Sequence, residues 1–304
     1  MVIITSQNQA ISLPHNIRLY LKREDLIHPH ISGNKYRKLK YNIAFAKANN
    51  YKTLLTFGGA YSNHIAATAA AGKAYNFSTI GIIRGDELEK ELDKNLLENK
   101  TLKQAAVDGM KFKFISRALY KQKEEEQFLA TLKKEFPEAY ILPEGGTNNL
   151  AIKGCEEILT PSDLSFDYVC CAVGTGGTIS GIINASAASQ RVLGFPALKG
   201  DFLTDEIQKL VTKSNWTLAK EYHFNGYAKV PETLVKFMNG FKKSHQIVLD
   251  PIYTGKMMYG IFDLISKGFF PQNSRILAIH TGGLQGIDGV NKKLLKKGLQ
   301  TIDI

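Results

Sequence analysis

Short apolar runs rich in β-branched residues alternate with longer segments of helical pattern along this chain. Six of these runs predict strands, at residues 52–57, 78–83, 111–115, 168–173, 191–195 and 275–280. The run 168–173 is apolar throughout, which is typical of a strand that is buried on both faces of a parallel sheet and covered by helices. The pattern therefore predicts an α/β fold.

The segments between the strands add helices and one candidate domain crossing. The charge-rich segment 121–135 predicts an exposed amphipathic helix that ends near Pro137, because proline lacks the amide hydrogen that a helix needs. A chain of 304 residues exceeds the roughly 250–300 residues at which single cores stop growing, so we expect two lobes. No linker, repeat or low-complexity tract separates them, and the glycine turn at 144–148 is the best candidate for a crossing.

The composition is that of an ordinary globular protein. Hydrophobic residues make up 44% of the chain, and no apolar run approaches the roughly 18 residues of a membrane-spanning helix. Residues 1–10 lack the basic and apolar parts of a secretory signal, so we expect a cytoplasmic protein without a membrane partner. The cysteines, Cys155, Cys170 and Cys171, have neither a disulfide framework nor zinc-site spacing; we expect them to act as small hydrophobes, and we expect no metal.

The net charge of +11 raises the question of a nucleic acid partner, because basic surfaces attract phosphate without sequence specificity. The lysines are spread along the chain, however, and no helix-turn-helix, zinc-finger or RNP-like motif occurs. We therefore expect a general attraction for anionic substrates and cofactors and no nucleic acid partner.

Lysine 35 is the first candidate for chemistry. The segment 32–40 places Lys35 at a Gly-Asn turn that opens a helix, with other cations around it. An ammonium group surrounded by positive charge loses its proton more readily, and the neutral amine forms Schiff bases. A basic, solvent-facing helix start is the alternative interpretation. The same residues match the S-x-x-K pattern of serine β-lactamases, but the companion S-D-N motif is absent, so we reject that site.

Two glycine turns provide candidate binding sites for anionic and polar groups. Residues 174–178 follow a predicted buried strand and precede the helical stretch 179–189, so their amides would point outward at a helix N-terminus and bind phosphate. The turn is neither a dinucleotide fingerprint nor a P-loop, and a plain strand-to-helix turn is the alternative. After Gly58 and Gly59, the residues Ser62, Asn63 and His64 open another helix; N-capping and packing roles are their alternatives. A lysine, an Asn-containing turn and a phosphate-type loop together suggest a phosphorylated aldehyde cofactor.

Six motifs in one order carry a resemblance to a known family. They are GNKYRKL at 33–39, GAYSNH at 59–64, EGG at 144–146, GTGGT at 174–178, DPIYTGK at 250–256 and HTGG at 280–283. This order resembles the 1-aminocyclopropane-1-carboxylate deaminase and D-cysteine desulfhydrase family over about residues 21–283. The resemblance implies pyridoxal 5'-phosphate as the cofactor and the tryptophan-synthase-β-like fold, fold type II of these enzymes. In that fold two open, mainly parallel sheets are each covered by helices.

The resemblance also implies a domain plan and a role for each motif. We expect a larger cofactor-binding domain at 1–36 and 147–304, a smaller α/β domain at 37–146, the cofactor in the cleft between them, and a homodimer. Lys35 would bind the cofactor aldehyde and later remove the α-hydrogen of the substrate. Lys38 lies three residues further along the helix, on the same face, and would contact the phosphate.

The remaining site residues also follow from the resemblance. Asn63 would bind the ring hydroxyl, Ser62 the substrate carboxylate, and Tyr253 and Tyr227 would line the substrate side. The expected catalytic residues are Lys35, Tyr253, Tyr227 and Ser62. The expected cofactor-binding residues are Lys35, Lys38, Asn63, Gly174, Thr175, Gly176, Gly177, Thr178, Thr254 and Thr281. The expected substrate-binding residues are Ser62, Asn63, His64, Tyr227 and Tyr253.

Two hydroxyl residues bear on the choice of substrate. Where this chain has Thr254 and Thr281, deaminases of the family carry glutamate and leucine, and desulfhydrases carry small hydroxyl residues. A pyridine nitrogen that faces a hydroxyl favours the unprotonated ring, a weaker electron sink that suits loss of a good leaving group. We therefore expect β-elimination of the D-cysteine type, giving pyruvate, ammonia and sulfide. The expected enzyme class is a lyase or deaminase, and hydrolase is a further class to which such an enzyme could be assigned.

Other interpretations stay open beside this one. The main alternative is 1-aminocyclopropane-1-carboxylate deamination to 2-oxobutyrate and ammonia. A dehydratase or racemase activity on the same cofactor is possible because the α-proton step is shared, and a non-enzymatic basic binding protein on the same fold is the alternative from another class. Tyr61, where the family pattern leads us to expect a glutamine-like residue, and the short stretch 191–222 depart from the family and bear on the pocket.

Overall fold

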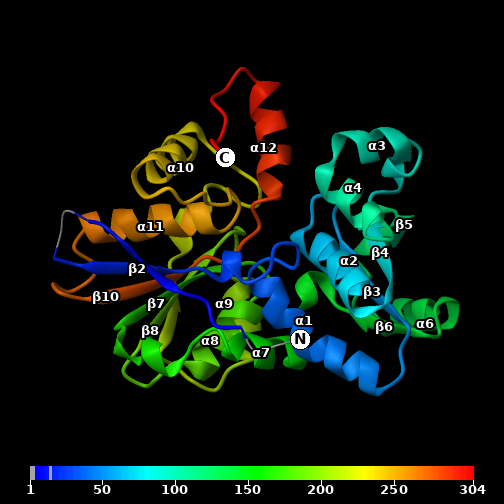
Figure 1. Cartoon of the computed structure of the whole chain (residues 1–304), viewed down its shortest axis with the longest axis horizontal. Helices are drawn as coiled ribbons and strands as arrows, with labels where there is room; N and C mark the ends of the chain where they lie inside the picture. The colour runs from blue at the N-terminus through cyan, green and yellow to red at the C-terminus, as the bar shows by residue number, and fades with distance from the viewer. Residues whose placement is uncertain (1–3, 14–15) are drawn as a thin grey trace.

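The computed structural model of this chain describes residues 4–13 and 16–304 and contains two separate sheets (Figure 1). The larger has six strands in the order β1-β2-β10-β7-β8-β9, and the smaller has four in the order β5-β4-β3-β6. Neighbouring strands run parallel in both sheets, except that β1 and β2 are antiparallel. The strands are β1 (Asn8–Ile11), β2 (Arg18–Lys22), β3 (Thr53–Gly58), β4 (Ser78–Arg84), β5 (Met110–Ile115), β6 (Ala139–Leu142), β7 (Tyr168–Val173), β8 (Arg191–Pro196), β9 (Trp216–Leu218) and β10 (Arg275–Ile279).

Helices cover the faces of the two sheets, as the α/β interpretation predicts (Figure 1). The α-helices are α1 (Asn34–Ala48), α2 (Asn63–Tyr75), α3 (Leu92–Glu98), α4 (Lys100–Val107), α5 (Arg117–Tyr120), α6 (Glu126–Glu135), α7 (Asn149–Glu156), α8 (Gly177–Ala185), α9 (Phe202–Gln208), α10 (Glu232–His245), α11 (Thr254–Ser266) and α12 (Gly286–Leu295). The short 3-10 helices are η1 (Glu24–Leu26), η2 (Asp86–Leu88), η3 (Glu144–Gly146), η4 (Pro161–Ser165) and η5 (Lys220–His223). No helix in the described ranges is both long and apolar enough to cross a membrane.

The larger sheet is buried on both faces. Cys170 belongs to one hydrophobic core, with residues of α10, α11 and α12, and the adjacent Cys171 belongs to a second core, with residues of α8 and α9. Successive side chains of a strand point to opposite faces, so two layers of helices need a strand that is apolar at every position. All three cysteines are free and buried, which confirms that they act as hydrophobes.

The structure confirms the six predicted strands and adds four that the pattern did not indicate. The additional strands are β1, β2, β6 and β9, which have five residues or fewer. Short strands carry too few alternating positions for periodicity to identify them.

The predicted helix at 121–135 is wrong in its first turn, since α6 begins only at Glu126 and residues 121–124 form a turn. That turn brings the Lys123 ammonium within 3.4 Å of the Glu144 carboxylate, which also accepts a hydrogen bond from the Tyr120 hydroxyl at 2.7 Å. Contacts with a distant segment thus accompany the turn where the local pattern favours a helix. The predicted helix at 179–189 occurs as α8, which begins earlier and ends at Ala185.

Four strands lead into loops that carry the predicted motifs, and these loops meet in pairs: a Cβ on Gly145 would lie 3.0 Å from Thr175, and one on Gly283 would lie 2.7 Å from Asn63. β3 leads to the start of α2, β6 to η3, β7 to the start of α8, and β10 to residues 280–283. Ligands of open parallel sheets bind at the carboxyl ends of the strands, where such loops meet. The strands of the smaller sheet all lie between residues 53 and 142, and the exact domain limits of 1–36, 37–146 and 147–304 stay a prediction.

Candidate active site

The turn before Lys35 is fixed by its contact with the loop that follows β10. Gly33 has a φ of +61°, and a Cβ on this glycine would overlap the carbonyl oxygen of Thr281. The amide of Asn34 donates to that same carbonyl at 3.3 Å. The Asn34 side chain donates to the Thr178 hydroxyl at 2.7 Å. The start of α1 is therefore joined to both the β10 loop and the start of α8.

Lys35 is partly accessible, and within the described residues its ammonium group has no hydrogen bond or ion pair. Burial and, to a smaller extent, the positive charge of Lys38 lower the pKa of Lys35 to about 7, against a still smaller opposing effect of Cys155. A neutral amine is therefore present in substantial amount at neutral pH. Since only the neutral amine attacks an aldehyde, this environment suits Schiff-base chemistry.

Lys38 is buried, and its ammonium group joins two loops. It is 2% exposed. It donates to the Gly145 carbonyl at 2.8 Å, to the Thr147 hydroxyl at 3.0 Å and, more weakly, to the Thr175 hydroxyl at 3.5 Å. The interpretation of this segment as a basic, solvent-facing helix start is therefore wrong.

Residues 174–178 form the turn between β7 and α8, beside the Lys38 ammonium. Gly176 caps α8 with a φ of +84°. A Cβ on Gly177 would lie 3.2 Å from Lys38 Nζ and 2.8 Å from the Thr147 side chain, so a glycine keeps the floor of this turn open. The first amides of a helix have no partner within it and bind anions together with the helix dipole. A buried cation beside them favours a phosphate site over a plain turn.

The start of α2 brings three polar side chains to the opposite side of the site. Ser62 is the N-cap of α2, and its hydroxyl accepts from the Ile65 amide at 3.4 Å, as the capping alternative predicts. Asn63 faces the β10 loop, where a Cβ on Gly283 would lie 2.7 Å from its Nδ2 atom. The buried Asn63 Oδ1 atom has no hydrogen-bond partner among the described residues.

His64 is buried against η3. It is 2% exposed, and neither ring nitrogen has a partner in the described part of the chain. Burial lowers the pKa of His64 well below its usual value, and the charges of Lys35 and Lys38 lower it further. A Cβ on Gly146, whose φ is +68°, would lie 2.6 Å from His64 Cε1. His64 is therefore a neutral imidazole that glycine alone allows to pack so closely.

The two predicted tyrosines contact each other at the edge of the glycine turn. The ring centroids of Tyr227 and Tyr253 lie 6.3 Å apart in an edge-to-face arrangement. A Cβ on Gly174 would lie 3.1 Å from Cε1 of Tyr253, so this ring borders the turn. Burial and the neighbouring Tyr227 raise the pKa of Tyr253 well above its usual value, so its hydroxyl keeps its proton at neutral pH.

The two threonines used to choose the substrate differ in their surroundings. Thr281 lies against the lysine turn. The fully buried Thr254 donates its hydroxyl proton to Asp250 Oδ1 at 2.7 Å and accepts from the Asp250 amide at 3.0 Å. Its hydroxyl has no second proton, so toward a ring nitrogen it has only a lone pair to offer. The sequence argument required Thr254 to donate its proton to an unprotonated ring nitrogen. In this arrangement that proton is donated to Asp250 instead.

Sequence reasoning missed the role of Lys256, which ends the DPIYTGK motif. This lysine is 1% exposed and donates to the carbonyls of His223 and Gly226, both at 2.9 Å. Those carbonyls belong to the loop that carries Tyr227 and that has positive φ values at Phe224, Asn225, Gly226 and Ala228. Burial lowers the pKa of Lys256 to about 8, against an opposing effect of Asp250. A lysine in a mostly apolar helix was the available signal.

The residues at these loops fit a phosphorylated aldehyde cofactor. A partly accessible amine of lowered pKa lies near a buried cation and a glycine turn at a helix start, and the buried Asn63 oxygen lacks a partner. The amine suits the aldehyde, the buried cation and the glycine turn suit the phosphate, and the Asn63 oxygen suits a polar group on the ring. This combination defines the class of enzymes that hold pyridoxal phosphate on a lysine.

Comparison with known proteins supports the same class. A family model described as "Pyridoxal-phosphate dependent enzyme" matches residues 4–282. The chain belongs to this family, within the group of 1-aminocyclopropane-1-carboxylate deaminases and D-cysteine desulfhydrases. It is a pyridoxal phosphate-dependent enzyme of fold type II, of the lyase or deaminase kind. The hydrolase term finds no support in these relatives.

Three of the matches span most of the chain. The bifunctional D-cysteine desulfhydrase/1-aminocyclopropane-1-carboxylate deaminase, mitochondrial, of Arabidopsis thaliana is 33% identical over 302 residues, covering 90% of this chain and 74% of that protein. A 1-aminocyclopropane-1-carboxylate deaminase of Bradyrhizobium sp. (strain BTAi1) is 24% identical, covering 91% and 90%. The crystal structure of an ACC deaminase homologue superposes with a TM-score of 0.78 at 28% identity, covering 96% of this chain and 94% of that chain.

Proposed function

We propose that this enzyme eliminates a β-substituent from a small amino acid, in the manner of a D-cysteine desulfhydrase. The observation that carries the proposal is the Lys35 amine, whose lowered pKa and position near Lys38 prepare it to bind an aldehyde and to accept a proton. The name of the Arabidopsis relative includes D-cysteine desulfhydrase, beside 1-aminocyclopropane-1-carboxylate deaminase. Pyruvate, ammonia and sulfide are the expected products.

Three loops would hold pyridoxal phosphate. Lys35 Nζ would bind its aldehyde carbon, the Lys38 ammonium and the amides of residues 174–178 its phosphate, and Asn63 its ring hydroxyl. Thr175 and Thr178 supply hydroxyls at the glycine turn, while Thr254 and Thr281 border the site from the other side. When bound, the cofactor supplies an electron sink that acidifies the α-hydrogen of the substrate.

The protein's own groups bind the substrate and move its protons. Ser62 and the free amides at the start of α2 bind the carboxylate, since helix N-termini favour anions. The Lys35 amine accepts the α-proton at Nζ, which a group with a pKa of about 7 does at neutral pH. Neutral His64 adds no positive charge next to Lys35, so it does not further oppose protonation of that amine.

The tyrosine pair faces the leaving group. The Tyr253 hydroxyl stays protonated because its pKa is raised, so it donates a hydrogen bond to the departing sulfur, and Tyr227 supports it by the edge-to-face contact. Tyr227 is 49% exposed, so it is the solvent-facing member of the pair.

Deamination of 1-aminocyclopropane-1-carboxylate is the second candidate, favoured by the name of the Bradyrhizobium relative. The hydrogen bond from Thr254 to Asp250 also supports this second candidate. Thr254 has no proton left to donate to a ring nitrogen, so the argument for an unprotonated ring, which favoured the desulfhydrase, is weakened. Products decide between the two: sulfide and pyruvate from D-cysteine, or 2-oxobutyrate from the cyclopropane amino acid.

The test is a direct assay of the purified protein loaded with pyridoxal phosphate. D-cysteine, L-cysteine and 1-aminocyclopropane-1-carboxylate are supplied in turn, and sulfide, pyruvate and 2-oxobutyrate are measured. Release of 2-oxobutyrate without sulfide would overturn the desulfhydrase assignment. A protein that takes up no pyridoxal phosphate would overturn the roles given to Lys35 and Lys38.

Two further expectations accompany this function. We propose a homodimer, as the family resemblance implies, and a cytoplasmic location, as expected from the sequence. Light scattering of the purified protein measures the first, and fractionation of the source cells measures the second.

A further inference from the structure

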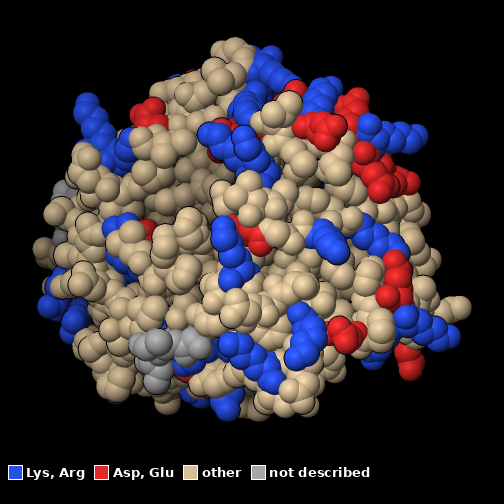
Figure 2. Space-filling model, turned by 45° about the vertical axis from the view of Figure 1, so that its right-hand side comes forward, with Lys and Arg blue, Asp and Glu red and all other residues tan. Residues whose placement is uncertain are grey.

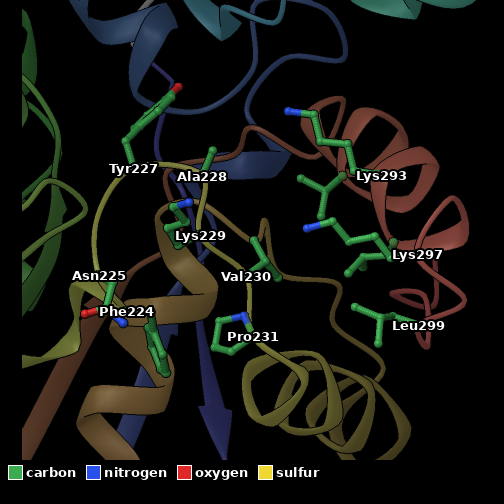
Figure 3. Close-up of a pocket in the computed structure, with 12 residues that line it drawn as sticks. Phe224, Asn225, Tyr227, Ala228, Lys229, Val230, Pro231, Lys293, Lys297 and Leu299 are labelled. Carbon is green, nitrogen blue, oxygen red and sulfur yellow. The ribbon is translucent and has the colours of Figure 1, made fainter.

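A pocket of about 650 Å³ lies between the loop that carries Tyr227 and the C-terminal helix α12 (Figure 3). Its walls are mainly apolar, formed by Val230 and Pro231 on the loop side and by Val290, Leu294 and Leu299 on the side of α12. Pockets that bind small molecules up to the size of a drug have volumes of roughly 300–1,000 Å³. The pocket therefore has room for far more than a thiol leaving group.

Three lysines line this pocket, and no acidic side chain does. Lys229 comes from the loop, and Lys293 and Lys297 extend toward it from the side of α12 (Figure 3). Within the described residues none of the three forms an ion pair, whereas Lys292 on the same helix pairs with Asp288 at 3.1 Å. Unpaired cations above an apolar floor match a ligand with an apolar chain and an anionic end.

Basic side chains predominate over acidic ones on the face of the molecule drawn in Figure 2, and acidic ones lie among them in places. The lining of the pocket contains three lysines and no acidic residue.

The pocket adjoins the active site on two sides. Tyr227 lines it and also contacts Tyr253, which borders the glycine turn. Lys293 Nζ lies 5.7 Å from the ring centroid of Tyr61, the residue directly before Ser62. Tyr61 in turn packs against α12, where a Cβ on Gly289 would lie 2.8 Å from its ring. A substrate anchored at Ser62 would thus have the pocket within reach of its side chain.

We propose that this pocket binds the distal end of the substrate's leaving group: a short apolar chain, linked through sulfur to Cβ, that ends in a carboxylate. This inference rests on the proposed β-elimination. The Cα–H proton goes to Lys35 Nζ, the Cβ–S bond breaks with its electron pair on sulfur, and sulfur takes up a proton. Water then converts the three-carbon fragment into pyruvate and ammonia, so one thioether and one water give one thiol, one pyruvate and one ammonia.

The experiment compares two thioethers of cysteine that differ only in the end of the chain. S-(3-carboxypropyl)cysteine and its terminal amide, each as both enantiomers, are supplied to the loaded enzyme, and kcat/KM is measured from pyruvate release. We expect the carboxylate to be preferred by about tenfold, since a charge-assisted hydrogen bond is about twice as strong as a neutral one and 1.4 kcal/mol corresponds to tenfold. In Lys293→Gln/Lys297→Gln the ratio should fall clearly below tenfold, because two of the three lining lysines are lost.

Lys296→Gln is the matched control, because Lys296 is exposed beside Lys297 and does not line the pocket. It should keep the tenfold ratio. An equal ratio in the wild type, a ratio that survives in the double variant, or a ratio lost equally in the control would each overturn the proposal. A change in native mass of the double variant by light scattering would assign the lysines to contacts between copies of the chain and would also overturn it.

Calorimetric binding separates failure of the pocket from failure of the reaction. If the carboxylate binds more tightly than the amide and loses this advantage in the double variant, but no pyruvate forms, the pocket stands and the proposed elimination is wrong. If D-cysteine is cleaved but the two thioethers bind and react alike, the reaction stands and the pocket assignment is wrong.

Discussion

The lysines at the start of α1 and those beside α12 have the same side chain, but they differ in burial, in hydrogen bonding and in electrostatic environment. Lys38 is buried and donates to three oxygens, and Lys35 has a pKa lowered to about 7. Lys293 and Lys297 are exposed and have no ion pair among the described residues. A desolvated ammonium becomes a reactive amine or a fixed structural cation, while a hydrated one remains a diffuse attractor of anions. The following predictions test this difference.

Removing the reactive amine should have the largest effect. Lys35→Ala should abolish covalent binding of the cofactor, with loss of the visible absorbance of the loaded protein, and lower turnover by at least about 10³-fold, because the same group is the proposed base. Lys47→Ala, at the exposed end of α1, is the control and should keep both. Full turnover in Lys35→Ala would show that another group acts as the base.

Removing the buried cation should weaken binding of the phosphate. Lys38→Met should raise the dissociation constant for pyridoxal phosphate by about 10- to 100-fold, because hydrogen bonds to charged groups contribute about 1.5–3 kcal/mol. Titration with pyridoxal, which lacks the phosphate, is the control. An equal loss of affinity for both compounds would contradict a phosphate contact.

The lowered pKa of Lys35 predicts a pH dependence of cofactor uptake. The neutral amine is the nucleophile, so the rate of covalent uptake should rise about tenfold per pH unit below the pKa. It should level off above about pH 7. Stopped-flow absorbance of the cofactor-free protein measures this profile. A rate that keeps rising beyond pH 9 would mean that Lys35 has the ordinary pKa of an exposed lysine.

Two lysines of α11 and its C-terminal end provide the same contrast between a buried and an exposed lysine, with smaller expected effects. Lys256→Met leaves the His223 and Gly226 carbonyls without their donor and should lower the free energy of unfolding by about 1–3 kcal/mol. It should also lower kcat several-fold through the loop of Tyr227. Lys267→Met removes an exposed pair with Asp263 and should cost less than about 1 kcal/mol. Denaturant unfolding measures both, and equal losses would refute a positioning role for Lys256.

The pattern of the sequence predicted the fold class because long buried strands reveal their environment locally. A run such as 168–173 is apolar at every position since both of its faces are covered. β1 and β9 escaped prediction because strands of four and three residues contain too little pattern. The helix predicted from residue 121 failed at its first turn, where Lys123 contacts the distant Glu144.

The motifs indicated the loops of the site but not the state of their side chains. Gly33, Gly146 and Gly174 stand out in the sequence. Only the structure shows why glycine is needed there: Thr281, His64 and Tyr253, respectively, approach these positions from other segments and leave little room for a Cβ. Likewise, no pattern in the sequence indicated that the Thr254 hydroxyl donates to Asp250 or that Lys256 holds the Tyr227 loop.

By itself, then, the sequence determined the α/β architecture, the family and the list of candidate residues. The reason is that strand burial and turn conformation depend on residues that are close together in the chain. Tertiary structure alone decided which lysines are amines and which are surface charges, which hydroxyls are free, and where the lysine-lined pocket lies beside the site. The physical reason is that burial, electrostatic coupling and hydrogen-bond saturation depend on groups that meet only after folding.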